Sequence, residues 1–119
     1  MLRLISGMLA ILGAVAGTVS NPSLLLPPPE RGTYKIVEAD LHVHTHLGDG
    51  ILSPFSLVLQ ARHQGLHAFA ITDHNQILAG KWTRRFSNLI GGPTVLLGEE
   101  ITAPDFHMIG VGLSERVAW

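Results

Sequence analysis

The architecture of this chain is set by seven consecutive residues, Ala68-Phe69-Ala70-Ile71-Thr72-Asp73-His74. A short apolar run bounded by polar residues is typical of a strand that is buried in a parallel sheet. Ligands and catalytic groups of parallel sheets and barrels gather at the carboxyl ends of the strands. The sequence therefore predicts a buried strand over residues 68–72, with side chains of functional interest directly after it.

A helix is predicted before this strand. Ser53 followed by Pro54 is an N-cap residue followed by a proline in the first helical turn. The helix is expected to run to about Gln64, and Gly65 is expected to end it, because glycine is the usual residue just past a helix C-terminus.

A second helix and three further strands complete the predicted order. Trp82, Phe86, Leu89 and Ile90 recur at helical spacing, and we expect Trp82 and Phe86 in the core. The strands are predicted over residues 34–42, 94–97 and 107–112. Strands that alternate with helices indicate an α/β fold with a parallel sheet, here of about four parallel strands.

Composition excludes several classes of protein. The chain has 119 residues, 46% of them hydrophobic and 14% charged, which is a globular and not a disordered composition. A net charge of −1 argues against a protein that coats nucleic acid. The absence of cysteine excludes disulfides, thiolate zinc sites and a cysteine nucleophile. Seven histidines against nine acidic residues direct attention to metal chemistry.

The N-terminus has the order of an export signal. Arg3 supplies a positive charge, an uncharged apolar run follows, and Ala14-Val15-Ala16 is a small-x-small cleavage site. Residues 1–20 are predicted to be a signal peptide or an uncleaved N-terminal anchor, in which residues 4–19 would hold the chain in a membrane. A wrongly assigned start is a third alternative. Either of the first two places the protein outside the cytoplasm, periplasmic or secreted.

Two further segments follow the predicted signal. Residues 21–32 form a proline-rich linker, because three consecutive prolines favour an extended tether. The globular domain is expected over residues 33–119. Membrane contact is expected only through the N-terminal anchor.

Histidines and carboxylates follow the predicted strands in a fixed order. His42 and His44 are two residues apart on a strand, so their imidazoles face the same way. Other candidates come at or near later strand ends: Asp49, Asp73, His74, Glu100 and His107. Imidazole and carboxylate ligands without thiolates suit zinc, manganese or iron. The H-x-H pair alone is a weak signal, but the whole set in this order strongly indicates a metal site.

Six segments together resemble the N-terminal half of the PHP (polymerase and histidinol phosphatase) domain over about residues 36–113. They are Asp40-Leu41-His42-Val43-His44-Thr45, Asp49-Gly50, Gly65-Leu66, Ala70-Ile71-Thr72-Asp73-His74, Gly98-Glu99-Glu100-Ile101-Thr102 and His107. The resemblance implies a distorted, TIM-like β/α barrel of seven strands, with up to three metals at the strand carboxyl ends. Family members hydrolyse phosphoesters, including histidinol phosphate and nucleic-acid 3′ ends. The exported character resembles a secreted branch that includes carbamate-ester hydrolases.

The resemblance also assigns the metal ligands. It makes His42 and His44 ligands of one metal, with Glu100 bridging that metal to a second. It makes His107 a ligand of the second metal. It makes Asp49 and His74 ligands of a third.

The alternative readings of several residues stay open. Asp73 either orients a metal-bound imidazole or caps the end of a strand. His46 is expected in solvent, and His63 and His67 are expected to have structural roles beside a helix end. His107 could instead be a core histidine.

This sequence departs from the family pattern in two places. Gly48 stands where the motif usually has serine. The family also has a further histidine and an Asp-x-His pair downstream, which do not occur among the 119 residues. We therefore expect an incomplete barrel that by itself has little or no turnover.

Two functions are compatible with these features. The first is a metal-dependent hydrolase in which metal-activated water attacks a phosphoester or a related ester of a small molecule. The alternative is a truncated or degenerate remnant that binds metal without catalysis. No nucleic-acid partner is expected, because the charge balance and the export signal disfavour it.

Overall fold

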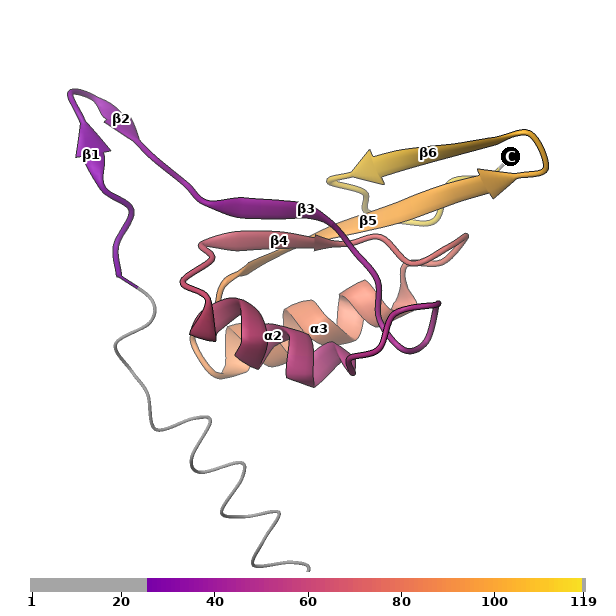
Figure 1. Ribbon diagram of the computed structural model, residues 1–119, viewed down its shortest axis with the longest axis horizontal. Coiled ribbons are helices and arrows are strands. Elements are labelled where there is room, and N and C mark those ends of the chain that lie inside the picture. The colour runs from indigo at the N-terminus through magenta and orange to yellow at the C-terminus, as the bar shows by residue number, and fades with distance from the viewer. Residues whose placement is uncertain (1–25, 119) are drawn as a thin grey trace, which may run out of the picture.

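The computed structural model describes residues 26–118, so the predicted signal segment and residues 21–25 of the linker lie outside it. In chain order the described elements are β1 Glu30–Arg31, β2 Tyr34–Lys35, β3 Ala39–Val43, α2 Pro54–His63, β4 Ala68–Ile71, α3 Leu78–Leu89, β5 Thr94–Ala103 and β6 Phe106–Val111. One sheet has four strands, and Figure 1 shows α2 and α3 together on one face of it and the small hairpin of β1 and β2 on an arm to one side. The fold is mixed α/β, as predicted.

The four-stranded sheet has the order β3-β4-β5-β6. β3, β4 and β5 are parallel, and β6 runs antiparallel to β5. The expectation of four parallel strands is therefore wrong for the last strand. Only Pro104 and Asp105 separate β5 from β6, and a link of two residues can make a hairpin but not the long crossover that parallel strands require.

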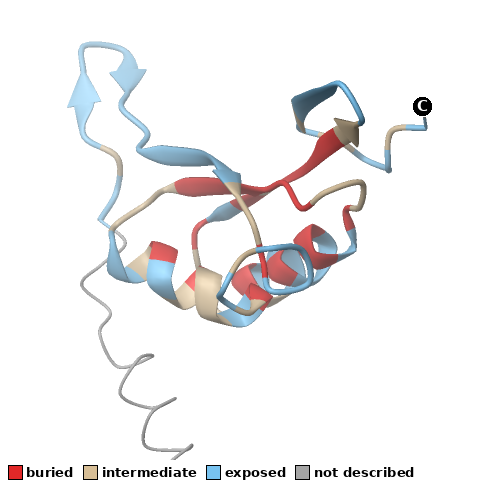
Figure 2. Ribbon diagram, turned by 45° about the vertical axis from the view of Figure 1, so that its right-hand side comes forward, coloured by how far each residue is buried: buried red, intermediate tan, exposed pale blue. Residues whose placement is uncertain are grey.

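The sheet curls into half of a barrel (Figure 1). Closure of the barrel by seven strands stays a prediction. β4 and much of β5 are buried, and β3 and β6 are mostly exposed (Figure 2). The central strands thus anchor the sheet, and its two outer strands carry exposed candidate ligands.

The core lies between the sheet and the two helices. It consists of Val58, Ala61, Phe69, Ile71, Ala79 and Val95. Burial of these side chains supplies the main favourable term in folding, because apolar area removed from water contributes about 25 cal/mol per Å². This core fixes β4 against α2 and α3 and so fixes the position of the residues that follow β4.

Helix α2 begins and ends as predicted. Pro54 is its first residue, and the Ser53 hydroxyl accepts a hydrogen bond of 3.0 Å from the Ser56 N–H. Gln64 is the C-cap, and Gly65 has a φ of +76°, which a residue with a side chain rarely adopts.

Helix α3 turns a different face to the core than expected. Its buried residues are Ala79, Gly80, Thr83 and Ser87, all small. A Cβ at Gly80 would lie 3.2 Å from a Leu97 methyl carbon, so the helix comes too close to the sheet for large side chains. Trp82 is 47% exposed, and its predicted core position is wrong. Phe86 is partly buried against the core. Its ring lies edge to face with the ring of Phe55, and the two ring centroids are 5.1 Å apart.

The predicted strand over residues 34–42 is two strands. Tyr34–Lys35 pairs with Glu30–Arg31 across a turn in which Gly32 has a φ of +61°, and the chain then enters β3 at Ala39. The glycine allows the chain to reverse, so the end of the proline-rich segment becomes part of this hairpin. Among residues 26–118, no helix combines the length and the apolar character that a membrane span requires.

Candidate metal centre

Six predicted ligands come together at one end of the sheet. His42 lies in β3, His44 and Asp49 follow it, and His74 follows β4. Glu100 lies inside β5, which extends six residues beyond its predicted end at Leu97, to Ala103, because β6 pairs with it there. His107 lies in β6, opposite Thr102. Parallel strands that end at one edge explain why residues far apart in sequence meet.

The first group of side chains is His42, His44 and Glu100. The Nε2 atoms of the two histidines lie 2.8 Å apart. The Oε2 atom of Glu100 lies 3.1 Å from His42 Nε2 and 2.9 Å from His44 Nε2. Three potential ligand atoms therefore converge on one small volume.

The second and third groups share members with the first. His44 Nδ1 lies 2.5 Å from Asp49 Oδ1, and Asp49 Oδ2 lies 3.4 Å from His74 Nε2. His107 Nδ1 contacts Glu100 Oε1, and His74 Nδ1 lies 3.8 Å from Glu100 Oε2. His44, His74 and Glu100 each belong to two groups, which makes the three groups one continuous cluster.

The donor atoms fit a divalent cation. Zinc–nitrogen bonds of about 2.0–2.1 Å in a tetrahedron put neighbouring ligand atoms about 3.3 Å apart. The separations of 2.8–3.1 Å among His42, His44 and Glu100 are close to that value. Two imidazole lone pairs facing each other would repel, and a cation between them removes this repulsion. The assignment of individual ligands to individual metals stays a prediction.

The carboxylates of the cluster are held in their charged form. Burial of Glu100, which is 5% exposed, raises the pKa of its carboxyl group, but hydrogen bonds from His107 and His42 and the charge of nearby histidines outweigh burial and bring the pKa below its ordinary value. The hydrogen bond from His44 lowers the pKa of Asp49 below its ordinary value. Both groups are therefore available as anionic ligands near neutral pH.

Asp73 directly precedes His74 in the chain and is fully buried. Its carboxylate accepts hydrogen bonds from the Thr45 N–H at 2.6 Å, the Thr45 hydroxyl at 2.7 Å and the Gln76 amide at 3.1 Å. These bonds tie the loop after β3 to the loop after β4. By holding Thr45, Asp73 helps to fix the position of the adjacent residue His44. None of the described hydrogen bonds of Asp73 involves a histidine.

The structure explains the glycine at position 48. A Cβ at Gly48 would lie 2.8 Å from Asp73 Oδ1, a carboxylate oxygen already fixed by Thr45. A serine there would push against this contact. Glycine at position 48, where the motif usually has serine, therefore leaves room for the close approach of the Asp73 carboxylate.

Sequence reasoning missed two residues that support His74. Thr102 Oγ1 lies 2.6 Å from His74 Nδ1. Asn75 accepts from the Thr102 N–H at 3.0 Å and donates to the Thr102 carbonyl at 3.1 Å. Asn75 has a φ of +51°, a conformation that asparagine tolerates better than most residues, and this preference was the available signal in the sequence.

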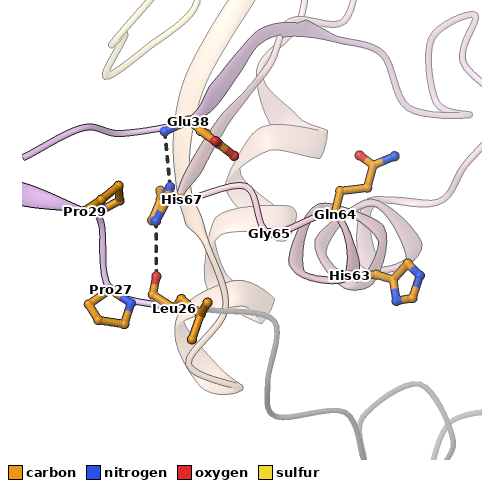
Figure 3. Close-up of a pocket in the computed structure, with 8 residues that line it drawn as sticks. All are labelled: Leu26, Pro27, Pro29, Glu38, His63, Gln64, Gly65 and His67. Carbon is orange, nitrogen blue, oxygen red and sulfur yellow. Dashed lines mark hydrogen bonds between the residues drawn. The ribbon is translucent and has the colours of Figure 1, made fainter.

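The remaining described histidines, His46, His63 and His67, belong to none of the three ligand groups. His46 and His63 are exposed. His67 accepts from the Glu38 N–H at 3.2 Å and donates to the Leu26 carbonyl at 3.1 Å, which ties the proline-rich segment to the start of β3 (Figure 3). These contacts agree with the structural role expected for His67.

Comparison with protein families and curated proteins gave three matches. The model of the PHP domain matches residues 40–109. An uncharacterized protein of Methanocaldococcus jannaschii is 30% identical over 92 residues, which are 68% of this chain and 53% of that protein. A 5′-3′ exoribonuclease of Haemophilus influenzae is 47% identical over 80 residues, which are 64% of this chain and 29% of that protein. The chain thus spans about half of the first protein and less than a third of the second.

Solved structures share the fold. A two-domain protein of Bacteroides vulgatus containing a predicted PHP-like metal-dependent phosphoesterase has a TM-score of 0.66 at 24% identity, over 74% of this chain and 29% of its own. A protein of Bifidobacterium adolescentis named as a metal-dependent phosphoesterase has a TM-score of 0.55 at 36% identity, over 71% of this chain and 28% of its own. An amidohydrolase of Chromobacterium violaceum with bound sulfate has a TM-score of 0.58 at 24% identity, over 66% of this chain and 28% of its own.

Proposed function

This chain belongs to the PHP domain family, and from that premise we propose that it is a metal-dependent phosphoesterase. The observation that carries the proposal is the surroundings of Glu100, a buried carboxylate that contacts His42 and His44 through one oxygen and His107 through the other. A carboxylate with both oxygens turned to different imidazole groups is suited to bridge two cations.

The six candidate ligands are assigned to three metal ions. In this proposal His42, His44 and Glu100 hold one ion, Glu100 and His107 a second, and Asp49 and His74 a third, with zinc, manganese or iron as the metal. Divalent ions, when bound, supply activation of water and neutralise charge that develops on phosphoryl oxygens. The lowered pKa of Glu100 keeps its carboxylate ionised for this role.

A phosphoester of a small molecule is the proposed substrate. The Bifidobacterium adolescentis protein is named as a metal-dependent phosphoesterase, and its 36% identity supports phosphoester chemistry. The Haemophilus influenzae relative carries the name 5′-3′ exoribonuclease, so an RNA phosphodiester belongs among the substrates to be tested. The net charge of −1 favours the smaller substrate.

The test is hydrolysis by the full chain with added Zn²⁺ or Mn²⁺. Because the barrel is incomplete, we expect at most slow release of phosphate from p-nitrophenyl phosphate, and loss of that release in Glu100→Gln and on chelation of the metal. His63→Ala, at an exposed helix end, is the matched control and should keep the wild-type rate. Short RNA and p-nitrophenyl acetate distinguish the phosphodiester and carboxylic-ester alternatives.

A second candidate is a metal-binding protein without turnover. The feature that favours it is the sharing of His44, His74 and Glu100 among the three groups, because the described residues cannot give three ions separate sets of three ligands. Metal binding that depends on Glu100, with no hydrolysis of any of these substrates, would support this candidate.

We also propose that the protein is exported, on the grounds of the charge, apolar run and small-x-small site within residues 1–20. A fusion of residues 1–25 to a reporter that is active only outside the cytoplasm should be active. The same fusion with Leu4 and Ile5 changed to aspartate should be inactive. A reporter signal confined to the cytoplasm for the unaltered segment would contradict export.

A further inference from the structure

His74 presents both ring nitrogens to the metal cluster. Its Nε2 lies 3.4 Å from Asp49 Oδ2, and its Nδ1 lies 3.8 Å from Glu100 Oε2. A neutral imidazole offers a lone pair on one nitrogen while the other carries the proton. The position of that proton therefore decides whether the lone pair of His74 is directed to a metal beside Asp49 or to a metal beside Glu100.

Thr102 lies against the nitrogen that faces Glu100. Its hydroxyl oxygen is 2.6 Å from His74 Nδ1, much closer than Glu100 Oε2. The same hydroxyl donates to the backbone carbonyl of Glu100 at 3.3 Å. With its own proton directed there, the hydroxyl accepts from His74 Nδ1–H. The lone pair then lies on Nε2, which faces Asp49.

Asn75 holds the Thr102 hydroxyl in this position. Asn75 forms two hydrogen bonds to the backbone of Thr102, as donor and as acceptor. The Asn75 backbone adopts a left-handed conformation, with a φ of +51°, which costs free energy for a residue with a Cβ and persists where surrounding contacts enforce it. The segment that carries His74 and the strand that carries Thr102 are thereby joined in a fixed register.

We propose that Thr102 is a positioning residue that keeps the proton of His74 on Nδ1 and so directs the lone pair of His74 Nε2 to the metal site that it shares with Asp49. This inference rests on the proposed function in so far as this site binds metal. Outer partners of ligating histidines fix the tautomer and the ring orientation, and their loss costs about 10–100-fold in metal affinity. We expect a loss of that size for Zn²⁺ in Thr102→Val.

Nitrogen NMR of the full chain labelled with ¹⁵N-histidine tests the inference, with the protein sedimented so that solubility does not limit the measurement. His74 resonances are identified by their absence in His74→Gln. In wild type with Zn²⁺ we expect a protonated Nδ1 and a metal-shifted Nε2. Thr102→Ser should keep this pattern, and Thr102→Val should lose it.

Thr83→Val is the matched control. The Thr83 hydroxyl is also buried and donates to a carbonyl, that of Ala79 at 2.7 Å within α3, and Thr83 belongs to none of the three ligand groups. This variant removes a buried threonine hydroxyl without touching His74. It should therefore show the wild-type pattern of His74 resonances and the wild-type affinity for Zn²⁺.

The wild-type spectrum alone can overturn the inference. A proton on His74 Nε2, or zinc on Nδ1, would do so, as would an unchanged pattern in Thr102→Val. If the chain binds none of Zn²⁺, Mn²⁺ and Fe²⁺, the proposed function fails, and the tautomer is read in the metal-free chain. A protonated Nδ1 in wild type and Thr102→Ser, lost in Thr102→Val, would support the role of Thr102 even then.

Discussion

At the scale of single residues, Glu100 lies at the centre of the proposed metal site. The residue is 5% exposed, belongs to two of the three ligand groups and contacts three histidines. We predict that Glu100→Gln weakens Zn²⁺ binding by more than about 100-fold, because loss of a direct ligand exceeds the 10–100-fold cost of losing an outer partner. Isothermal titration calorimetry measures this.

His63→Ala controls for the loss of any metal-binding side chain from the surface. His63 is exposed in the last turn of α2, away from the cluster. Its replacement should leave Zn²⁺ affinity unchanged. Equal losses in the two variants would remove the basis for assigning the metal centre to Glu100.

A second prediction at this scale concerns Asp73. Asp73→Ala leaves the buried N–H and hydroxyl of Thr45 without their acceptor, and an unsatisfied buried polar group costs about 1–3 kcal/mol. We expect the free energy of unfolding to fall by about that amount in urea titrations followed by tryptophan fluorescence. Asp105→Ala, exposed in the β5–β6 turn, should change it by less than about 0.5 kcal/mol.

At the scale of elements, α3 packs on the sheet through its small residues and turns large apolar ones to solvent. Leu89 is 82% exposed, whereas Val58 of α2 is fully buried in the core. We predict that Leu89→Gln changes the free energy of unfolding by less than about 0.5 kcal/mol. Val58→Ala should cost about 2 kcal/mol, from lost transfer free energy and the cavity left behind. Thermal unfolding by circular dichroism compares them, and a large loss in Leu89→Gln would contradict the packing of α3.

At the scale of the whole molecule, the half barrel leaves both outer strands of the sheet open. Among the described residues β3 pairs only with β4, and β6 only with β5. β3 also carries Leu41, which is 52% exposed. Unpaired strands with apolar side chains are templates for pairing with other chains. We therefore predict that the chain self-associates as its concentration rises.

Leu41→Lys should reduce this association, because a charged side chain on an outer strand opposes strand pairing. Sedimentation velocity over a range of concentrations measures the effect. Leu89→Lys places the same charge on the outer face of α3 and should leave association as in wild type. If Leu89→Lys were the variant that dissociates the chain, the contact would lie on the helices and not on the sheet.

The two helices, the buried strand β4, the family and the candidate ligands could be predicted from the sequence, whereas the hairpin of β1 and β2 and the direction of β6 could not. The limits of α2 followed from Ser53, Pro54 and Gly65, because caps act through bonds to residues three or four positions away. The burial of β4 followed from its apolar run. The meeting of His42, His74 and Glu100 followed from the rule that parallel strands end at one edge of a sheet.

The tertiary structure alone decided features that depend on the distance between elements. The close approach of α3 to β5 at Gly80 turned Trp82 outward, although its helical spacing had predicted the core. The bonds of Asp73 to Thr45 and of Thr102 to His74 join residues 28 positions apart. Periodicity and capping carry no information on such pairs, because the contacts arise only when packing of the core brings the loops after β3 and β4 and strand β5 together.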